Sequence, residues 1–234
     1  DLASFLASAT DMDYFIESVA ATADAVRAAG KHTKRIGISF DEWNVWYLHR
    51  AESHPPSGDN WPVAPVLLED RYNVADAVVV GNLLISLLRH TDRVHAASLA
   101  QLVNVIAPIM TEPGGRAWRQ TTFHPFALTA KHARGEVLQV AIDAPVLETD
   151  KHGPVDGIDA VATRDPETGA VALFCVNRSL SEGTHVQVDL RGLGDLRVEQ
   201  CVTLSNPDHT WSATADDATS VLPGRNDTAA VTDG

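Results

Sequence analysis

The stretch ISFDEWNVWY, residues 38–47, places Glu42 directly before two tryptophans and a tyrosine, in a chain that holds only 5 Trp and 3 Tyr residues. A carboxylate can act as a nucleophile, an acid or a base, and the apolar C–H faces of sugars stack on indole rings. The stretch therefore suits carbohydrate chemistry. Taken alone, a structural glutamate at the end of a strand is an equally good interpretation.

The two tryptophans of this stretch receive different predictions. We expect Trp43, next to Glu42, to pack in the core or behind the site, because tryptophan is also common core material. We expect Trp46 to form a platform for a ligand.

The elements that must position these residues begin with three predicted helices. Apolar residues recur at helical spacing in residues 11–29, 69–90 and 121–134. Thr10 and Asp13 resemble a capping box before the first of these helices. The second helix is apolar on nearly every side, which predicts that it is well buried.

Two strands are predicted between these helices. Residues 36–42 form the first strand, and its two-residue period places Glu42 on the same face as Phe40. Residues 94–103 form the second strand. Between the first strand and the next helix, residues 49–65 are rich in Pro, Gly, Ser and His and exceed the length of a minimal connection, which predicts a functional lid.

This order of helices and strands is typical of an α/β unit with parallel strands. Parallel strands are buried on both faces, so a sheet of only two would leave large apolar surfaces in water. Part of the sheet is therefore expected outside these residues. In a parallel α/β barrel the chemistry lies at the carboxyl ends of the strands, which is where Glu42 stands.

The second half of the chain changes to a two-residue period, which is typical of a β-sandwich. We place the domain boundary near Gly135, so that residues 1–135 carry the α/β units and residues 136–234 the sandwich, incomplete at its end. We expect Asp159 and the other late acidic residues to lie on solvated faces. The predicted strands are residues 137–141, 158–163, 171–176, 185–190 and 198–204.

Composition excludes several classes of protein. The net charge of −13 argues against a nucleic-acid-binding protein, which needs Lys and Arg to contact phosphates. No stretch approaches the roughly 18 apolar residues of a membrane span, and no secretory signal pattern opens the chain. Cys175 and Cys201 are predicted to be reduced core residues, as in a cytoplasmic protein. The 10 histidines form no ligand pattern, so we predict neither a metal nor another cofactor.

Three motifs together resemble the α-L-arabinofuranosidases of glycoside hydrolase family 51. They are DEWNVWY at residues 41–47, LAQLVNVIAPI at residues 99–109 and WRQT at residues 118–121. The resemblance covers nearly the whole chain but only the carboxyl-terminal half of such an enzyme. It implies the last βα units of a (β/α)8 TIM barrel, with strands seven and eight, followed by a β-sandwich domain.

The resemblance also implies roles for three residues. Glu42 would be the nucleophile of a retaining glycosidase that releases terminal α-L-arabinofuranosyl residues from oligosaccharides or polysaccharides. Gln101, at the end of strand eight, would contact the sugar or orient the nucleophile, and Trp46 would line the pocket for the leaving group. The family often forms hexamers, so a homo-oligomer is expected.

One catalytic group of the family is missing from the sequence. The acid/base glutamate of the family belongs to an Asn-Glu pair on strand four, and no such pair occurs in these residues. Glu112 is a weak substitute because its neighbours resemble a rim loop, and Asp41 is expected on the face opposite to Glu42. We therefore expect the amino-terminal half of the barrel to be missing and the isolated polypeptide to be inactive.

Two alternatives remain open at the level of sequence. The first is an endoglucanase or another retaining hydrolase of the same barrel clan, which would use Glu42 on a different sugar. An open cleft rather than a closed pocket would distinguish it. The chain is also compatible with a non-catalytic binding or assembly fragment, which the absence of the acid/base residue favours.

Overall fold

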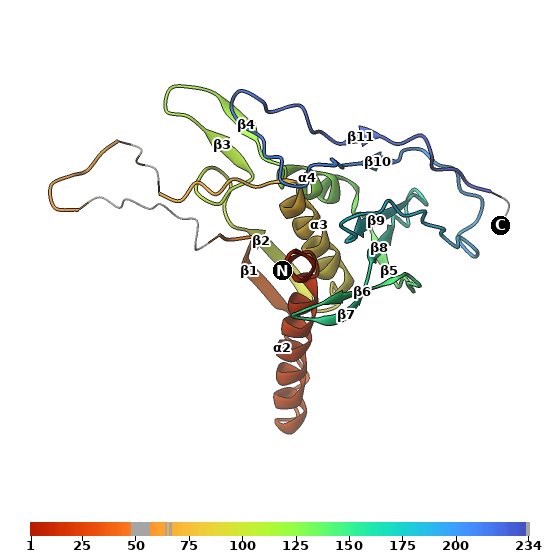
Figure 1. The fold of residues 1–234 in the computed structure, drawn as a ribbon. Coiled ribbons are helices and arrows are strands. Elements are labelled where there is room, and N and C mark those ends of the chain that lie inside the picture. Colours follow the sequence, from red (N-terminus) through yellow and green to blue (C-terminus); the bar gives the residue numbers. More distant parts are fainter. Residues whose placement is uncertain (48–56, 64, 66, 233–234) are drawn as a thin grey trace.

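The structure is a computed structural model that describes residues 1–47, 57–63, 65 and 67–232. The predicted lid at residues 49–65 lies mostly outside the described residues. Helix α3 occupies the centre of the molecule, with α1 and α2 on one side and α4 on another (Figure 1). The helices are α1 (Leu2–Leu6), α2 (Ala9–Ala29), α3 (Val74–Arg89) and α4 (Phe123–His132).

Helix α3 begins at a capping box that was not predicted from the sequence. The Asn73 side chain accepts a hydrogen bond from the backbone N–H of Asp76 at 3.0 Å, and the Asp76 carboxylate accepts one from the N–H of Asn73 at 2.7 Å. Both bonds satisfy backbone donors that the helix itself leaves free. The helix therefore starts after Asn73, five residues later than predicted, while its predicted burial is confirmed.

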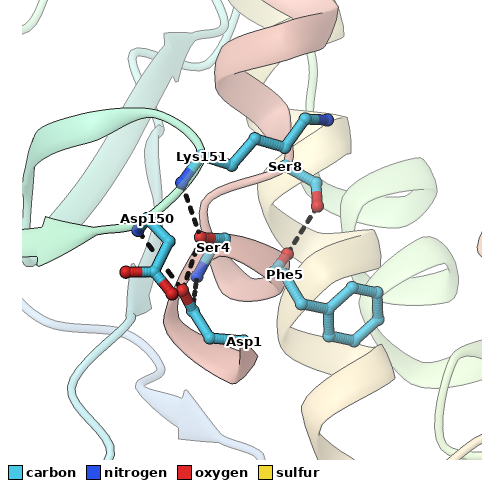
Figure 2. A pocket seen from close by; sticks show the side chains of 6 residues that line it. All are labelled: Asp1, Ser4, Phe5, Ser8, Asp150 and Lys151. Atoms are coloured by element: carbon cyan, nitrogen blue, oxygen red, sulfur yellow. Dashed lines mark hydrogen bonds between the residues drawn. The ribbon is translucent and has the colours of Figure 1, made fainter.

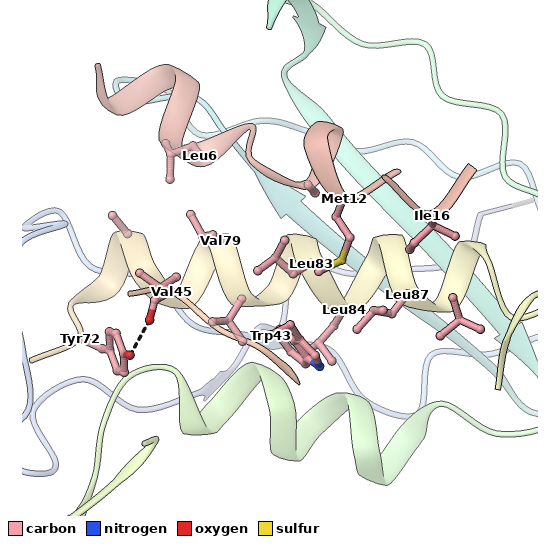
Figure 3. Packing of buried hydrophobic residues seen from close by; sticks show 14 residues of the cluster. Leu6, Met12, Ile16, Trp43, Val45, Tyr72, Val79, Leu83, Leu84 and Leu87 are labelled. Carbon is pink, nitrogen blue, oxygen red and sulfur yellow. Dashed lines mark hydrogen bonds between the residues drawn. The ribbon is translucent and has the colours of Figure 1, made fainter. Parts of the chain in front are cut away.

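The apolar core surrounds α3. Leu6, Met12 and Ile16 of α1 and α2 pack on one side of it, and Trp43 approaches from another side (Figure 3). Each fully buried side chain of this size stabilises the fold by about 1.5–3 kcal/mol relative to its exposed state. The core thus fixes the end of the strand that carries Glu42.

Helix α2 confirms the predicted helix but begins differently. It starts at Ala9, and Thr10 and Asp13 do not cap it. Asp13 instead accepts a hydrogen bond from Ser86 at 2.5 Å and pairs with Arg89 at 2.9 Å, both on α3. The Asp13 carboxylate therefore bonds to α3 and does not cap α2 as predicted.

The outer part of α2 has little cover. Figure 1 shows it projecting away from the rest of the molecule, and only Ala9, Met12 and Ile16 of its residues are buried. Val19 and Val26 are 38% and 63% exposed, and Tyr14 and Phe15, nearer the start of the helix, are 65% and 58% exposed. An amphipathic helix normally buries its apolar stripe, so this face is suited to contact further protein.

Strands β1 (Ile38–Trp43) and β2 (Val94–Leu99) form a two-stranded parallel sheet. The N–H of Ile38 donates to the carbonyl of Arg93 at 2.7 Å at one end of the pair. Strand β2 stops four residues earlier than predicted, and the chain soon afterwards adopts positive φ angles at Asn104 and Val105, where a strand cannot continue.

A hairpin that was not predicted follows β2. It consists of β3 (Ile109–Thr111) and β4 (Ala117–Arg119), with Met110 opposite Trp118. Each strand has three residues, which are too few to show a two-residue period.

The second half of the chain forms a three-stranded antiparallel sheet in the order β5-β8-β9 and two strand pairs. The predicted strands at residues 158–163 and 171–176 are confirmed as β8 and β9. Residues 185–190 form no strand, and residues 198–204 keep only β10. The second sheet of a sandwich stays a prediction. The strands are β5 (Glu136–Leu138), β6 (Val146–Thr149), β7 (Gly153–Asp156), β8 (Ile158–Arg164), β9 (Val171–Asn177), β10 (Val202–Thr203) and β11 (Gly224–Arg225).

Asp159 of β8 is not on a solvated face, contrary to the prediction. It is 5% exposed and accepts hydrogen bonds from Asn82 at 2.6 Å and from Arg178 at 2.8 Å. Arg89 donates to its other oxygen, and Arg178 also donates to Asn82 at 3.0 Å. Three buried side chains, those of Asn82, Asp159 and Arg178, together with the exposed Arg89, join α3 to the antiparallel sheet.

The burial of the two cysteines and the absence of a membrane span were also predicted from the sequence. Cys175 is exposed and Cys201 is half-buried, so the prediction that both are core residues was wrong, although both are free thiols. No helix in the described part of the chain combines the length and the apolar character needed to cross a membrane.

Candidate functional site

Glu42 and Gln101 come from the ends of the two parallel strands. Glu42 is the next-to-last residue of β1, and Gln101 follows the end of β2 by two residues. The N–H of Ala100 donates to the carbonyl oxygen of Trp43 at 3.1 Å, which ties the two strand ends together. Because neighbouring parallel strands end at the same edge of a sheet, the structure brings both residues to one edge.

An irregularity in the strand pairing sets the direction of Glu42. Phe40 is opposite Ala97 and Trp43 is opposite Leu99, so three steps along β1 match two steps along β2. Such a β-bulge shifts the alternation of side chains and is common beside active sites.

The pattern of buried and exposed side chains along β1 agrees with this bulge. Phe40 and Trp43 pack against the core, whereas the two residues between them, Asp41 and Glu42, are both exposed. The prediction that Glu42 shares the face of Phe40, opposite to Asp41, was therefore wrong. Glu42 is exposed at the end of β1, directly before the buried Trp43.

The two tryptophans of the stretch differ as expected in burial. Trp43 is 6% exposed and stacks on Phe126 of α4, with ring centroids 6.5 Å apart, which confirms it as a core residue. Trp46 is 56% exposed, as a ligand platform requires. Its role as a platform stays a prediction.

Asn44 connects the loops that follow the two strands. Its side-chain nitrogen donates to the carbonyl oxygens of Ala100 and Ile106, both in the loop after β2. Its side-chain oxygen accepts from the N–H of Val45 at 2.8 Å. One side chain of the first loop thus holds two points of the second.

Tyr72 also connects the loops that follow β1 and β2. It is fully buried, and its hydroxyl lies 2.6 Å from the carbonyl oxygen of Val45 and 3.1 Å from that of Ile106. Burial, assisted by the charges of Asp70 and Asp76, raises the pKa of Tyr72 far above its ordinary value, so it remains a neutral donor.

Gln120 and Asp70 complete this support. Gln120 accepts the N–H of Tyr72 at 2.9 Å and donates to the carbonyls of Asp70 at 3.0 Å and Ala107 at 2.8 Å. The Asp70 carboxylate accepts the N–H of Tyr47 at 2.9 Å. Buried networks with every group satisfied are rigid, which is what a site on loops requires.

Asn44, Tyr72 and Gln120 were not predicted to have a role in the site. Two of them stand inside the quoted motifs: Asn44 follows Glu42 by two residues, and Gln120 belongs to WRQT. Polar residues inside apolar stretches were the available signal, because a buried amide needs partners.

Two hollows lie away from Glu42, Gln101 and Trp46. One of about 400 Å³ lies between α1 and the turn after β6, and one of about 450 Å³ lies between α2, α3 and the β6–β7 hairpin. Figure 2 shows the first, where the N–H of Lys151 donates to Ser4 at 3.0 Å. Neither hollow is lined by a predicted site residue. The first is lined by Asp1, Ser4, Phe5, Ser8, Asp150 and Lys151.

The other carboxylates considered for acid/base chemistry have different surroundings. Glu112 lies in the exposed turn between β3 and β4, and its N–H donates to the carbonyl of Arg116 at 2.9 Å. Asp41 is exposed beside Glu42, with a hydrogen bond from Ser39. The candidate site therefore comprises the carboxylate of Glu42 at the end of β1 and the amide of Gln101 and the indole of Trp46 on the loops after the two strands. All three are exposed, and a buried polar network supports these loops.

Comparison with known protein families identifies one match. Residues 41–234 match the family described as the α-L-arabinofuranosidase C-terminal domain. The matched part begins within the DEWNVWY stretch and includes Glu42, Trp46 and Gln101.

Two curated relatives match almost the whole chain. An exo-α-(1→6)-L-arabinofuranosidase of Bifidobacterium longum is 53% identical over 230 residues, which are 97% of this chain and 44% of the relative. An intracellular exo-α-(1→5)-L-arabinofuranosidase of Streptomyces lividans is 50% identical over 234 residues, which are 100% of this chain and 35% of the relative. The chain thus spans less than half the length of either relative.

A solved structure gives the same result. The structure of a family 51 α-L-arabinofuranosidase from Bifidobacterium longum superposes with a TM-score of 0.89 at 46% identity, covering 96% of this chain and 44% of that one. The structure of an α-L-arabinofuranosidase from Thermotoga petrophila, at 23% identity and a TM-score of 0.77, agrees in fold.

Proposed function

Because the chain belongs to the family 51 α-L-arabinofuranosidases, whose carboxyl-terminal domain it carries, we propose that it is part of a retaining, exo-acting α-L-arabinofuranosidase with Glu42 as nucleophile. The observation that carries this proposal is the placement of Glu42 and Gln101 at one edge of a parallel strand pair. Their loops share a buried polar support.

The two strands belong to a larger sheet in this proposal. In the described residues β1 and β2 pair only with each other, although parallel strands are normally covered on both faces. The exposed apolar face of α2, with Tyr14 and Phe15, also suits further protein. We assign β1 and β2 to the last two strands of a (β/α)8 barrel, with residues 136–234 as a separate β domain.

Glu42 performs the first chemical step. Its ionised carboxylate attacks the anomeric carbon of a terminal arabinofuranosyl residue, and a C–O bond forms to the enzyme while the glycosidic C–O bond breaks. The leaving oxygen takes a proton from a second carboxyl group. Water then attacks the same carbon, gives its proton to that second group and releases both arabinose and Glu42.

The second carboxyl group comes from outside the described residues in this mechanism. A retaining enzyme needs it about 5–5.5 Å from the nucleophile, with a pKa high enough to donate a proton. Glu112 lies in a hairpin turn, and Asp41 is adjacent to Glu42 in sequence, so neither is a good candidate. We assign this role to the amino-terminal part that the relatives have in addition.

Gln101 and Trp46 bind the substrate. The Gln101 amide can donate to a sugar hydroxyl or to Glu42, and the exposed indole of Trp46 can stack on the leaving group. The substrate is a terminal α-L-arabinofuranosyl group, following the exo-acting relatives, and we place the reaction inside the cell as the name of the Streptomyces lividans relative states.

The test compares Glu42→Gln with the unchanged enzyme in the full-length polypeptide that carries these residues. We expect hydrolysis of p-nitrophenyl α-L-arabinofuranoside to fall by at least about 1,000-fold, because the amide cannot form the covalent intermediate. Glu112→Gln serves as the matched control and should retain activity within about threefold. Equal activity of Glu42→Gln and the unchanged enzyme would refute the role of Glu42.

Two further measurements separate the alternatives. A cellooligosaccharide in place of the arabinofuranoside tests the endoglucanase interpretation, and we expect no turnover. Residues 1–234 assayed alone should also be inactive, because the acid/base group is missing. Turnover by this isolated chain that depends on Glu42 would show that the second carboxyl group lies within it.

A further inference from the structure

Asn44 has every polar atom of its side chain engaged between the two loops of the site. The amide nitrogen has two hydrogens, and it donates to two carbonyl oxygens, those of Ala100 and Ile106. The amide oxygen accepts from the N–H of Val45. This arrangement fixes the side chain within its own loop and leaves both donors for the neighbouring loop.

The two acceptors of Asn44 are at the two ends of the segment that begins with Gln101. The carbonyl of Ala100 belongs to the peptide unit that joins Ala100 to Gln101, so the hydrogen bond orients the backbone at Gln101 directly. The carbonyl of Ile106 lies where the same loop returns to the protein, and it also faces the hydroxyl of Tyr72 at 3.1 Å.

Packing does little to hold the intervening residues. Gln101, Leu102 and Val103 are all exposed, with Leu102 at 74% and Val103 at 42%. Ala100 and Ala107, which flank the loop, are buried. Gln101 therefore takes its position from its flanking peptide, to which Asn44 is bonded.

We propose that Asn44 is the positioning residue that sets the distance and direction between Glu42 and Gln101. Asn44 is two residues beyond Glu42. Its side chain therefore connects the backbone next to Gln101 with the strand end that carries the carboxylate. This inference rests on the proposed function of Glu42. Asn44 itself does not contact the reacting atoms.

The consequence for the reaction is geometric. A displacement of about 1 Å in a catalytic constellation can cost about 100-fold in rate, because the reacting groups leave their productive alignment. Loss of Asn44 leaves the carbonyl of Ala100 without this donor, whereas Ile106 keeps its contact with Tyr72. The backbone before Gln101 then keeps the bond from the N–H of Ala100 to the carbonyl of Trp43 but loses the one that orients the peptide unit of Gln101 itself.

The test is a double-mutant cycle in the full-length polypeptide with p-nitrophenyl α-L-arabinofuranoside. Asn44→Ala and Gln101→Ala should each lower kcat by about 10- to 100-fold, with a smaller change in KM, because the lost alignment matters most in the transition state. If Asn44 acts through Gln101, the double variant should be no more than about threefold worse than the poorer single variant. Multiplied losses in the double variant would overturn the inference.

The matched control is Asn82→Ala, which removes a buried asparagine bonded to Asp159 and Arg178 and not to the two loops of the site. It should lower the Tm while kcat of the folded enzyme stays within about threefold. Should Asn82→Ala lower kcat as much as Asn44→Ala at matched Tm, then general loss of stability explains both, and the inference fails. Asn44→Asp, which keeps the shape of the side chain, replaces Asn44→Ala should the latter not fold.

A crystallographic measurement keeps the inference independent of the proposed function. In Asn44→Ala we expect the Cα of Gln101 to move by about 1 Å or more relative to that of Glu42. An unchanged separation would refute the positioning role even where the enzyme is active. Activity that does not depend on Glu42 would refute the proposed function alone, and a moved Gln101 would still support the role of Asn44.

Discussion

Arg178 donates a hydrogen bond to Asp159 at 2.8 Å, and the two side chains are only 7% and 6% exposed. Asp159 belongs to β8, and Arg178 follows the end of β9. Asn82 of the central helix bonds to both. A buried ion pair of this kind joins the antiparallel sheet to the helix that supports the candidate site.

Removing the charge of Asp159 should be strongly destabilising. Asp159→Asn leaves Arg178 buried without a compensating carboxylate, which costs about 3–5 kcal/mol, whereas the same change in an exposed pair costs less than about 1 kcal/mol. Urea denaturation measures the difference. Asp189→Asn is the matched control, because Asp189 pairs with Arg191 on the surface. Equal losses in the two variants would contradict the importance of burial.

The hydroxyl of Tyr72 should contribute to stability through the two loops that it joins. Tyr72→Phe leaves the carbonyls of Val45 and Ile106 without this donor, and we expect a loss of about 1–3 kcal/mol in the free energy of unfolding. Tyr14→Phe, at a site 65% exposed on α2, should change stability by less than about 0.5 kcal/mol. A Tyr72→Phe variant as stable as the unchanged protein would show that water replaces the hydroxyl.

Gly135 should resist substitution for two reasons. Its φ is +74°, and an added Cβ would lie 2.2 Å from the carbonyl oxygen of Arg164, which is a backbone atom that cannot easily move. Gly169 has the same φ of +74° with nothing within 4 Å of its added Cβ. Gly169→Ala therefore measures the backbone strain alone, about 1–2 kcal/mol, and Gly135→Ala should cost clearly more. Similar values for the two variants, by thermal or urea denaturation, would argue against the clash.

His124 should make stability depend on pH. Burial, assisted by the charge of Arg119, lowers the pKa of this imidazole below its ordinary value of 6.5. The unfolded chain then binds more protons than the folded one near pH 6, so stability is present above pH 6.5 and falls as the pH decreases. His124→Gln should reduce that slope between pH 7 and 5, measured by urea denaturation.

The matched control for this experiment is His185→Gln, at an exposed position of the second half. It removes a histidine without removing a buried imidazole and should leave the slope of the unchanged protein. A slope that His124→Gln does not reduce would show that burial at this position has no effect on proton binding.

The sequence predicted the longer elements well because their patterns are local. Helix α3 and strands β8 and β9 each repeat an apolar period over enough residues to be recognised. The hairpin of β3 and β4 was not predicted, because three residues per strand are too few to show the two-residue period of a strand. The start of α3 was predicted five residues too early, although Asn73, directly before the long apolar run, is a preferred cap residue.

The features of the candidate site also fall into those that the sequence predicted and those that it did not. Glu42 and its aromatic neighbours were recognisable from one continuous stretch, and so was the burial of Trp43. The face of Glu42 was not, because a β-bulge arises from pairing with β2, more than 50 residues further along the chain. The partners of Asp159 were equally hidden, as Asn82 is 77 residues away in sequence.

By itself, therefore, the sequence determined the family of the chain and which side chains are candidates for the site, since motifs of this kind consist of consecutive residues. Only the tertiary structure decided which way Glu42 faces, which carbonyls Asn44 holds and which charges are buried. Those properties depend on segments that are distant in sequence and meet only when the apolar core around α3 forms.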